Sequence, residues 1–440
     1  MASLPKTMKA VFIQKTGGTD VLQYADVPVP EPKEGEVLVK NEYIGINYID
    51  TYFRSGVYNP PKFPYILGRE GSGTIAAVGP NAPSDLSPGT RVAYLAQHAY
   101  AEYTSAPANS TVPIPDSIDT KTAAASILQA LTAVTLIRDA HEVKKGDWVL
   151  VTAAAGGVGL WLCQLLKSVG AHVIATASTE EKRNLAKANG AEVLLEYHEE
   201  DRNLFVKEVL EITGGEGVHA VFDSVGKSTF DSSLAVVRRK GSMVSFGNAS
   251  GPVEGFSLAR LAAKNVKLVR PTLFGYIATR EEFQSAAKEL WSFIEKDGFN
   301  VKIHDVYPLS DIVRATEDIQ SRKTTEWARA NCPEDSARLP APRSYEFLRV
   351  DFTKGKLHIG SISRKAKKKT TETSKVHFIL NRWRPGKVFI MEDNHDRVDE
   401  SDYHNIKLHE PFSWIWPSLS DPIGMEKFIS LINYVFELKG

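Results

Sequence analysis

The sequence predicts an α/β protein in which a doubly wound parallel sheet is joined to a second domain of short, irregular strands. Three features predict this fold. Short apolar runs alternate with helical segments from about residue 148 to residue 269, a glycine turn follows the first of these runs, and short strand-like runs separated by glycine and proline fill the first 128 residues. A chain of 440 residues is long enough for two or three domains.

The composition is that of a globular protein without a dominant charge. Lysine plus arginine and aspartate plus glutamate number 53 each, so the formal net charge is zero and favours neither nucleic acid nor a membrane as partner. The two cysteines, Cys163 and Cys332, are too few for a disulfide framework and fit a reducing compartment. Without an apolar leader or an apolar run of about 18 residues, a cytoplasmic protein is expected.

The first domain, residues 1–128, is expected to be an irregular barrel or sandwich because its strand-like runs are short and separated by turn formers. The expected strands are 9–13, 36–40, 73–78 and 91–94.

The second domain, residues 129–274, is entered by an alanine- and leucine-rich helix at 123–140 that contains no glycine or proline. The expected strands are then 148–153, 172–177, 192–195, 218–223, 242–246 and 266–269, and the expected helices 158–169, 180–189, 201–213 and 228–237. This alternation predicts a ligand at the carboxyl ends of the strands. Residues 275–325, with helices at 281–296 and 315–322, are expected to return the chain to the first domain.

The turn after strand 148–153 reads Ala-Ala-Ala-Gly-Gly-Val-Gly and ends at Gly159. Glycines allow a tight turn, and the start of a helix directs free N–H groups toward it, which suits a phosphate. The turn departs from the usual G-x-G-x-x-G, so by itself it is also compatible with a structural turn that binds nothing.

The second strand of the alternating part indicates which dinucleotide would bind. It ends in Ser178-Thr179, without the carboxylate that normally binds the ribose 2′-hydroxyl of NAD, and Lys182 follows in the next helix. A hydroxyl and a cation suit the 2′-phosphate of NADP, so NADPH is favoured. The alternative is that Ser178 is only the N-cap of that helix and Lys182 a solvated lysine.

Together with further motifs, these residues resemble the medium-chain dehydrogenase/reductase superfamily, and within it the zinc-free, zeta-crystallin-like NADPH:quinone oxidoreductases. The motifs are KKGDWVLV at 144–151, AAAGGVG at 153–159, GINYIDTYFRSG at 45–56, LGREGSG at 67–73, SFGNASG at 245–251 and RPTLFGY at 270–276. The resemblance covers about residues 8–325. It implies a Rossmann-type NADPH-binding domain beside a GroES-like catalytic domain.

Zinc-dependent members of the superfamily carry a cysteine near the position of Ile46-Asn47, a histidine in place of Arg69 and a four-cysteine lobe. None of these ligands is present in this chain. Since a zinc site needs such ligands at fixed spacing, no metal site is expected.

The resemblance also implies a set of site residues. Asn47, Tyr52 and Tyr58 would be the catalytic residues over the nicotinamide, with Asn47 bound to the carbonyl oxygen of the acceptor and the tyrosines stacked on its ring. For the tyrosines, ordinary packing is the alternative. The implied cofactor contacts are Asn47, Thr132, Gly156, Gly157, Val158, Ser178, Lys182, Tyr197, Ser224, Phe246, Gly247, Phe274 and Arg322.

The implied function is metal-free hydride transfer from NADPH to a quinone or another small electrophilic carbonyl compound. An enone or enal double-bond reductase is the enzymatic alternative, and an NADPH-binding protein that contacts AU-rich RNA is the non-enzymatic one. The resemblance further implies a homodimer.

From residue 326 onward the family pattern ends, so the last strand of the first domain is expected to be missing and a sheet edge to be open. Residues 326–440 are then either an artefact of the gene model or an appended domain, in which residues 355–359 could supply the missing strand. The basic run at 364–369 is read either as a solvated charge run or as a nuclear localisation or nucleic-acid patch.

Overall fold

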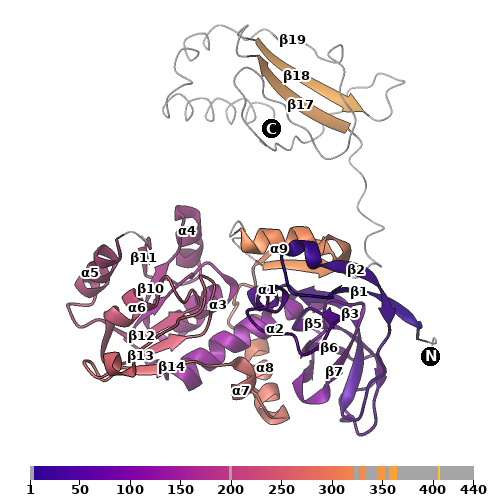
Figure 1. Cartoon of the computed structure of the whole chain (residues 1–440), viewed down its shortest axis with the longest axis horizontal. Helices are drawn as coiled ribbons and strands as arrows, with labels where there is room; N and C mark the ends of the chain where they lie inside the picture. Colours follow the sequence, from indigo (N-terminus) through magenta and orange to yellow (C-terminus); the bar gives the residue numbers. More distant parts are fainter. Residues whose placement is uncertain are drawn as a thin grey trace. The chain divides into compact units, whose positions relative to one another are not determined.

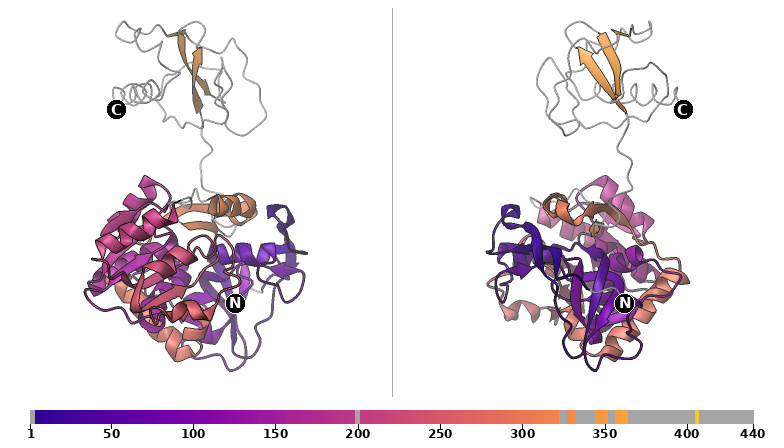
Figure 2. Two further views of the ribbon diagram at one scale, coloured as in Figure 1. Left: turned by 60° about the vertical axis from the view of Figure 1, so that its left-hand side comes forward. Right: turned by 90° about the vertical axis from the view of Figure 1, so that its right-hand side faces the viewer.

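The computed structural model describes residues 4–197 and 201–321, together with the backbone of the strands at 327–331, 344–351, 356–363 and 405–406. The chain divides into two units, Met1–Ser336 and Ala337–Gly440. The first unit contains a part built on a parallel sheet and a β-rich part with two further sheets, and a long helix lies between the two parts (Figures 1 and 2).

The parallel sheet of the first unit has six strands in the order β11-β10-β9-β12-β13-β14. All five neighbouring pairs are parallel, which confirms the doubly wound fold. The strand order reverses between β9 and β12, and a ligand crevice is expected at that point. The strands are β9 (Trp148–Val151), β10 (His172–Thr176), β11 (Val193–Leu195), β12 (Val218–Asp223), β13 (Val237–Ser245) and β14 (Lys267–Val269).

All four helices expected between these strands are present within a few residues of the predicted bounds: α3 (Gly157–Val169), α4 (Glu180–Ala188), α5 (Arg202–Ile212) and α6 (Phe230–Val236). The central strand β9 is buried on both faces, since Val149, Leu150 and Val151 are each 0% exposed.

Helix α2 (Thr120–Thr135) links the two parts of the unit and continues as a π-helical turn, Leu136–Ala140. Asp119 caps it by accepting a hydrogen bond from the backbone N–H of Thr122. Within the described ranges, 120–140 is the one helical stretch long and apolar enough to cross a membrane. Of its most apolar window, 78% is buried inside the protein, as in a core helix.

The other part of the unit is β-rich, as expected. A seven-stranded sheet has the order β15-β16-β3-β5-β6-β8, with β7 also paired to β3, and a three-stranded sheet has the order β2-β1-β4. The first sheet consists of β3 (Glu36–Gly45), β5 (Glu70–Val78), β6 (Arg91–Leu95), β7 (Tyr103–Pro107), β8 (Thr111–Pro113), β15 (Ile303–Pro308) and β16 (Trp327–Asn331). The second consists of β1 (Thr7–Ile13), β2 (Gln23–Pro28) and β4 (Tyr65–Ile66).

The remaining α-helices among the described residues of the first unit are α1, α7, α8 and α9. Helices α8 (Arg280–Glu295) and α9 (Ile312–Gln320) match the two expected helices. Helix α1 (Tyr48–Ser55) was not expected from the sequence; it begins where the Asp50 carboxylate accepts a hydrogen bond from the backbone N–H of Asn47 and ends at Gly56 in the left-handed region (φ 89°). A short helix, α7 (Leu273–Tyr276), follows β14.

The expectation of a missing closing strand is wrong. β16 runs parallel to β15 and antiparallel to β3, so it fills the position between them and covers the edge that we expected to be open. The sequence Trp327–Asn331 does not match the family pattern, but strand pairing uses backbone groups, which any residue other than proline supplies.

In the second unit, β17 (Ser344–Asp351), β18 (Lys356–Ser363) and β19 (Asn405–Ile406) form a separate antiparallel sheet. Residues 355–359 therefore do not close the first domain, because residues 356–359 belong to β18 of this sheet. The basic run at 364–369 lies outside the described residues.

Candidate active site

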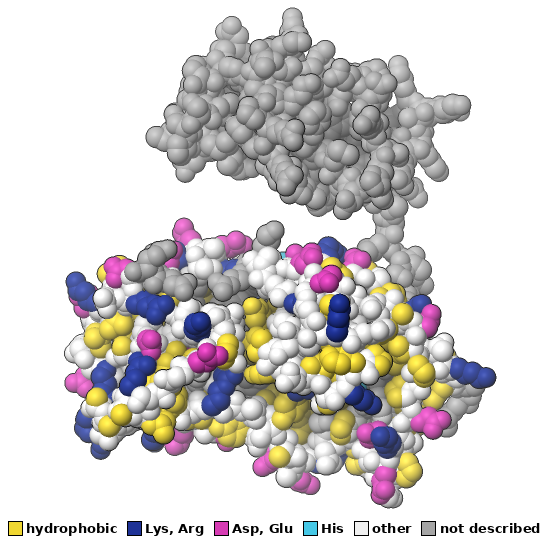
Figure 3. Space-filling view, in the orientation of Figure 1, with side chains coloured by type: hydrophobic (Ala, Val, Ile, Leu, Met, Phe, Trp, Pro, Cys, Tyr) yellow, Lys and Arg dark blue, Asp and Glu magenta, His cyan; other side chains and the backbone are white. Residues whose placement is uncertain are grey.

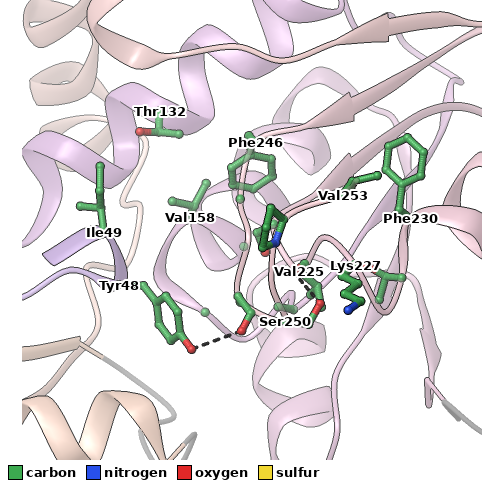
Figure 4. A pocket seen from close by; sticks show the side chains of 18 of the residues that line it. Tyr48, Ile49, Thr132, Val158, Val225, Lys227, Phe230, Phe246, Ser250 and Val253 are labelled. Atoms are coloured by element: carbon green, nitrogen blue, oxygen red, sulfur yellow. Dashed lines mark hydrogen bonds between the residues drawn. The ribbon is translucent and has the colours of Figure 1, made fainter. Parts of the chain in front are cut away.

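A cleft of about 1240 Å³ lies between the two parts of the first unit. Helices α1 and α2 line it on one side, and the glycine turn and the ends of β10, β12 and β13 line it on the other. Figure 4 shows Tyr48 and Ile49 facing Val158 and Phe246 across this space, with Thr132 on the helix beside them. The structure brings fourteen of the predicted site residues to this cleft; the exception, Arg322, lies outside the described residues.

The glycine turn has the geometry of a phosphate cradle. Gly156 is the N-cap of α3 and offers no capping side chain, so the first turn of the helix has no side-chain partner for its N–H groups. A Cβ on Gly159 would lie 2.6 Å from the carbonyl oxygen of Ala154, so only glycine allows the helix to approach the turn this closely. Ala153 is held in the left-handed region at φ 48°.

At the end of β10, the structure corrects one alternative. Thr179, not Ser178, is the N-cap of α4, with its side chain accepting from the backbone N–H of Lys182 at 3.3 Å. Ser178 is exposed and lines the cleft together with Lys182 in the first turn of α4. Tyr197 also lines it, and its hydroxyl donates to the carbonyl oxygen of Ser228 at 2.7 Å.

A buried carboxylate fixes the loop after β12. Asp223 is 0% exposed and accepts hydrogen bonds from the backbone N–H groups of Val225 and Gly226 and from the hydroxyls of Thr229 and Ser233. These bonds fix the start of the loop that carries Ser224 along the cleft.

The segment that follows β13 packs against the loop that carries Ser224. A Cβ on Gly247 would overlap the carbonyl oxygen of Ser224, so the two backbones approach more closely than any other residue would permit. The neighbouring Phe246 points into the cleft (Figure 4). The segment after β13 therefore depends on glycine to form this wall.

Asn47 lies at the buried floor of the cleft and is 2% exposed. Its side-chain N–H donates to Glu70 at 2.6 Å, and its carbonyl oxygen accepts from Gln129 at 3.1 Å. Glu70, 0% exposed in β5, also accepts from the backbone N–H of Leu128 in α2. This network fixes the Asn47 amide and leaves one of its two N–H hydrogens for a bound acceptor.

Tyr48, Tyr52 and Tyr58 form an aromatic wall. The ring of Tyr52 makes edge-to-face contacts with Tyr48 at 5.6 Å and with Tyr58 at 5.2 Å. The Tyr52 hydroxyl accepts from the backbone N–H of Asn248 at 3.0 Å, across the cleft. Burial raises the pKa of this hydroxyl to about 12, so it remains protonated and able to donate.

On α2, the Thr132 hydroxyl donates to the carbonyl oxygen of Leu128 at 2.7 Å, so it faces the cleft as an acceptor. Phe274 of α7 is 40% exposed and lines the cleft near Arg69. Sequence reasoning missed Tyr48, Arg69, Lys227 and Arg270 as lining residues. Arg69 lies in the motif LGREGSG, and an arginine between glycine and glutamate at the start of a buried strand was the signal that could have found it.

In the described ranges, no group of three histidine, cysteine, aspartate or glutamate side chains is arranged to hold a metal ion. Cys163 is buried in α3, and burial raises the pKa of its thiol to about 12. It is therefore a core side chain and not a thiolate ligand at neutral pH.

Asp50 gives a testable pH dependence. It is 5% exposed, and burial raises the pKa of its carboxyl from 3.8 to about 6, although the hydroxyl of Tyr100 donates to it at 2.8 Å. Because the folded state holds the proton more tightly, this group stabilises the fold below about pH 4, and that contribution is lost as the pH rises through about 6.

We expect Asp50→Asn to lack this dependence. Between pH 4 and pH 8, the free energy of unfolding of the variant should gain about 2 kcal/mol relative to wild type. Urea unfolding of both proteins across this range measures the difference. Parallel pH profiles of the two proteins would contradict the assignment of the raised pKa to Asp50.

Comparison with known proteins places this geometry in a family. Residues 33–116 match the family model described as alcohol dehydrogenase GroES-like domain, and residues 157–292 match the model described as zinc-binding dehydrogenase. A probable quinone oxidoreductase of Schizosaccharomyces pombe is 45% identical over 328 residues, which are 74% of this chain and 98% of the relative.

Two solved structures extend the likeness to the fold. A mycobacterial protein complexed with NADPH is 45% identical, with a TM-score of 0.71 over 74% of this chain and all of that one. The Escherichia coli quinone oxidoreductase complexed with NADPH is 41% identical, with a TM-score of 0.70 over 73% of this chain and 99% of that one.

Fold, cleft and relatives together define a medium-chain dehydrogenase/reductase. Within that superfamily, the chain belongs to the quinone oxidoreductases.

Proposed function

We propose that this protein binds NADPH in the cleft and reduces quinones by hydride transfer without a metal ion. The observation that supports this most is the pairing, in one cleft, of an uncapped helix N-terminus with an aromatic wall. The relatives bound to NADPH and named quinone oxidoreductases support both halves of the proposal.

The residues of the cleft fit the dinucleotide. Gly156, Gly157 and Val158 would hold the pyrophosphate at the start of α3, where N–H groups and the helix dipole favour negative charge. Ser178, Lys182 and Tyr197 would hold the 2′-phosphate. Ser224, Phe246, Gly247, Thr132, Phe274 and Asn47 would line the rest of the cofactor, and Arg322 remains a predicted contact.

When bound, NADPH supplies a hydride from C4 of its nicotinamide ring. The chain itself orients the acceptor: Tyr52 and Tyr58 offer aromatic faces for a flat ring, and the remaining N–H of Asn47 offers a donor for a carbonyl oxygen. A quinone needs no further catalytic group in such a site, because after hydride addition its oxygen takes a proton from water or a nearby hydroxyl.

NADPH oxidation at 340 nm with a naphthoquinone tests the proposal, with a 2-alkenal as the competing acceptor. We expect turnover with the quinone and little with the alkenal, because double-bond reduction needs a placed proton donor for the α-carbon. A preference for the alkenal would replace the quinone reductase by a double-bond reductase.

The domain limits 1–128, 129–274, 275–325 and 326–440 and the homodimer are parts of this proposal. Light scattering of the purified chain measures the oligomeric state. Cytoplasmic localisation stays a prediction, whereas binding of AU-rich RNA was only an alternative and nothing supports it. On the face drawn in Figure 3, basic and acidic side chains of the first unit are interspersed, and this pattern does not favour nucleic acid.

A further inference from the structure

Arg69 is one of the cationic side chains that line the cleft. Its guanidinium lies over the ring of Phe53 in α1 at 4.9 Å and over the ring of Phe274 in α7 at 5.1 Å. The two rings come from the two parts of the unit, so the guanidinium bridges the cleft between them. A guanidinium flanked by ring faces keeps its N–H groups at its edges.

The charge of Arg69 is not neutralised by an ion pair with any carboxylate in the described part of the chain. Asp50 and the hydroxyl of Tyr65 lie close enough to interact with it electrostatically. Its Nε atom is buried without a hydrogen-bond partner. An incompletely partnered cation in a half-buried position is costly to the fold unless a ligand completes its contacts.

We propose that Arg69 is a catalytic residue that donates hydrogen bonds to the acceptor oxygen on which negative charge develops during hydride transfer. This inference rests on the proposed function of the cleft. The acceptor is a quinone or a similar flat compound with a carbonyl oxygen conjugated to its ring, held between Arg69 and the tyrosine wall.

The reaction balances without a proton from Arg69. The quinone receives a hydride, that is two electrons and one proton, which leaves NADP⁺ and a hydroquinone anion whose charge lies on oxygen. One proton from solvent then gives the neutral hydroquinone. Arginine keeps its own proton throughout because its pKa lies far above neutral pH, so its role is electrostatic.

The alternative is a purely structural role, in which Arg69 acts as a strut that only holds α1 and α7 at a fixed separation. A strut needs the planar side chain between the rings, whereas oxyanion stabilisation needs the positive charge. Arg69→Gln keeps a planar amide and removes the charge, and Arg69→Lys keeps the charge and loses the planar fork. Arg138→Gln is the matched control, because Arg138 is exposed, pairs with Glu289 and does not line the cleft.

The first measurement reports on the anion directly. 4-Nitrophenol, titrated by absorbance with protein in the presence of NADP⁺, stands in for the hydroquinone anion. We expect wild type and Arg138→Gln to favour the bound phenolate and so lower its apparent pKa, Arg69→Lys to do so in part, and Arg69→Gln to lose the effect.

The second measurement is steady-state reduction of 1,4-naphthoquinone. In Arg69→Gln, kcat should fall roughly tenfold to hundredfold, while the Kd for NADPH changes less than about twofold. Unchanged kcat and an unchanged nitrophenol titration would overturn the inference. Losses of kcat, NADPH affinity and thermal stability in Arg69→Lys, with Arg69→Gln close to wild type, would assign a strut instead. Arg69-dependent phenolate binding by a wild-type protein that reduces no quinone would contradict the proposed function alone.

Discussion

Replacing Gly247 by alanine should strongly weaken NADPH binding. The added Cβ would overlap the backbone carbonyl oxygen of Ser224, which cannot rotate away as a flexible side chain could. The segment after β13 must therefore shift away from the loop that Asp223 fixes. Since Phe246 lines the cleft from this segment, the Kd for NADPH should rise on the order of 100-fold.

Quenching of tryptophan fluorescence by NADPH measures the affinity, and thermal unfolding shows whether the fold survives. Gly214→Ala is the matched control: Gly214 has φ 64° with open space around its Cβ position and does not line the cleft. The control should lose about 1 kcal/mol of stability from backbone strain and no affinity. Tight NADPH binding by Gly247→Ala would show that the contact between the two loops does not shape the cofactor site.

Replacing Lys182 by glutamate should reverse the preference between the two nicotinamide cofactors. The change places a negative charge where we expect the 2′-phosphate to bind, and the two negative charges would repel each other. The ratio of kcat/KM for NADPH to that for NADH should fall roughly 100-fold, mainly through KM for NADPH. Helix α4 itself should tolerate the change, because glutamate in a first turn interacts favourably with the helix dipole.

Lys187→Glu provides the comparison on the same helix. Lys187 is exposed in the last turn of α4 and does not line the cleft, so the ratio should stay close to that of wild type. Equal losses with NADPH and NADH in Lys182→Glu would remove Lys182 from the 2′-phosphate site. Equal effects of the two substitutions would point to a general change of surface charge.

The β-rich domain illustrates where sequence reasoning reached its limit. Short strands such as β8 and the two-residue β4 carry too few residues for a period of two to appear. β16 was missed for a different reason: its partners, β15 and β3, supply the hydrogen bonds that hold it, and no local pattern encodes them. Helix α1 was missed because its stop signal, Gly56, lies in a segment interpreted only as a family motif.

The sequence by itself determined the alternating α/β part, the glycine turn, and the absence of a carboxylate at the end of β10, because these depend on periodicity and on residue type at fixed spacing. Tertiary structure alone decided that Thr179 is the N-cap of α4, that Glu70 and Gln129 fix Asn47, and that Arg69 lies between two rings. Such contacts join residues that are far apart in the chain, and no pattern within one segment records them. The glycine turn that we expect to bind the pyrophosphate lies in one short stretch of sequence, whereas the expected acceptor site forms only after the two parts of the unit have packed together.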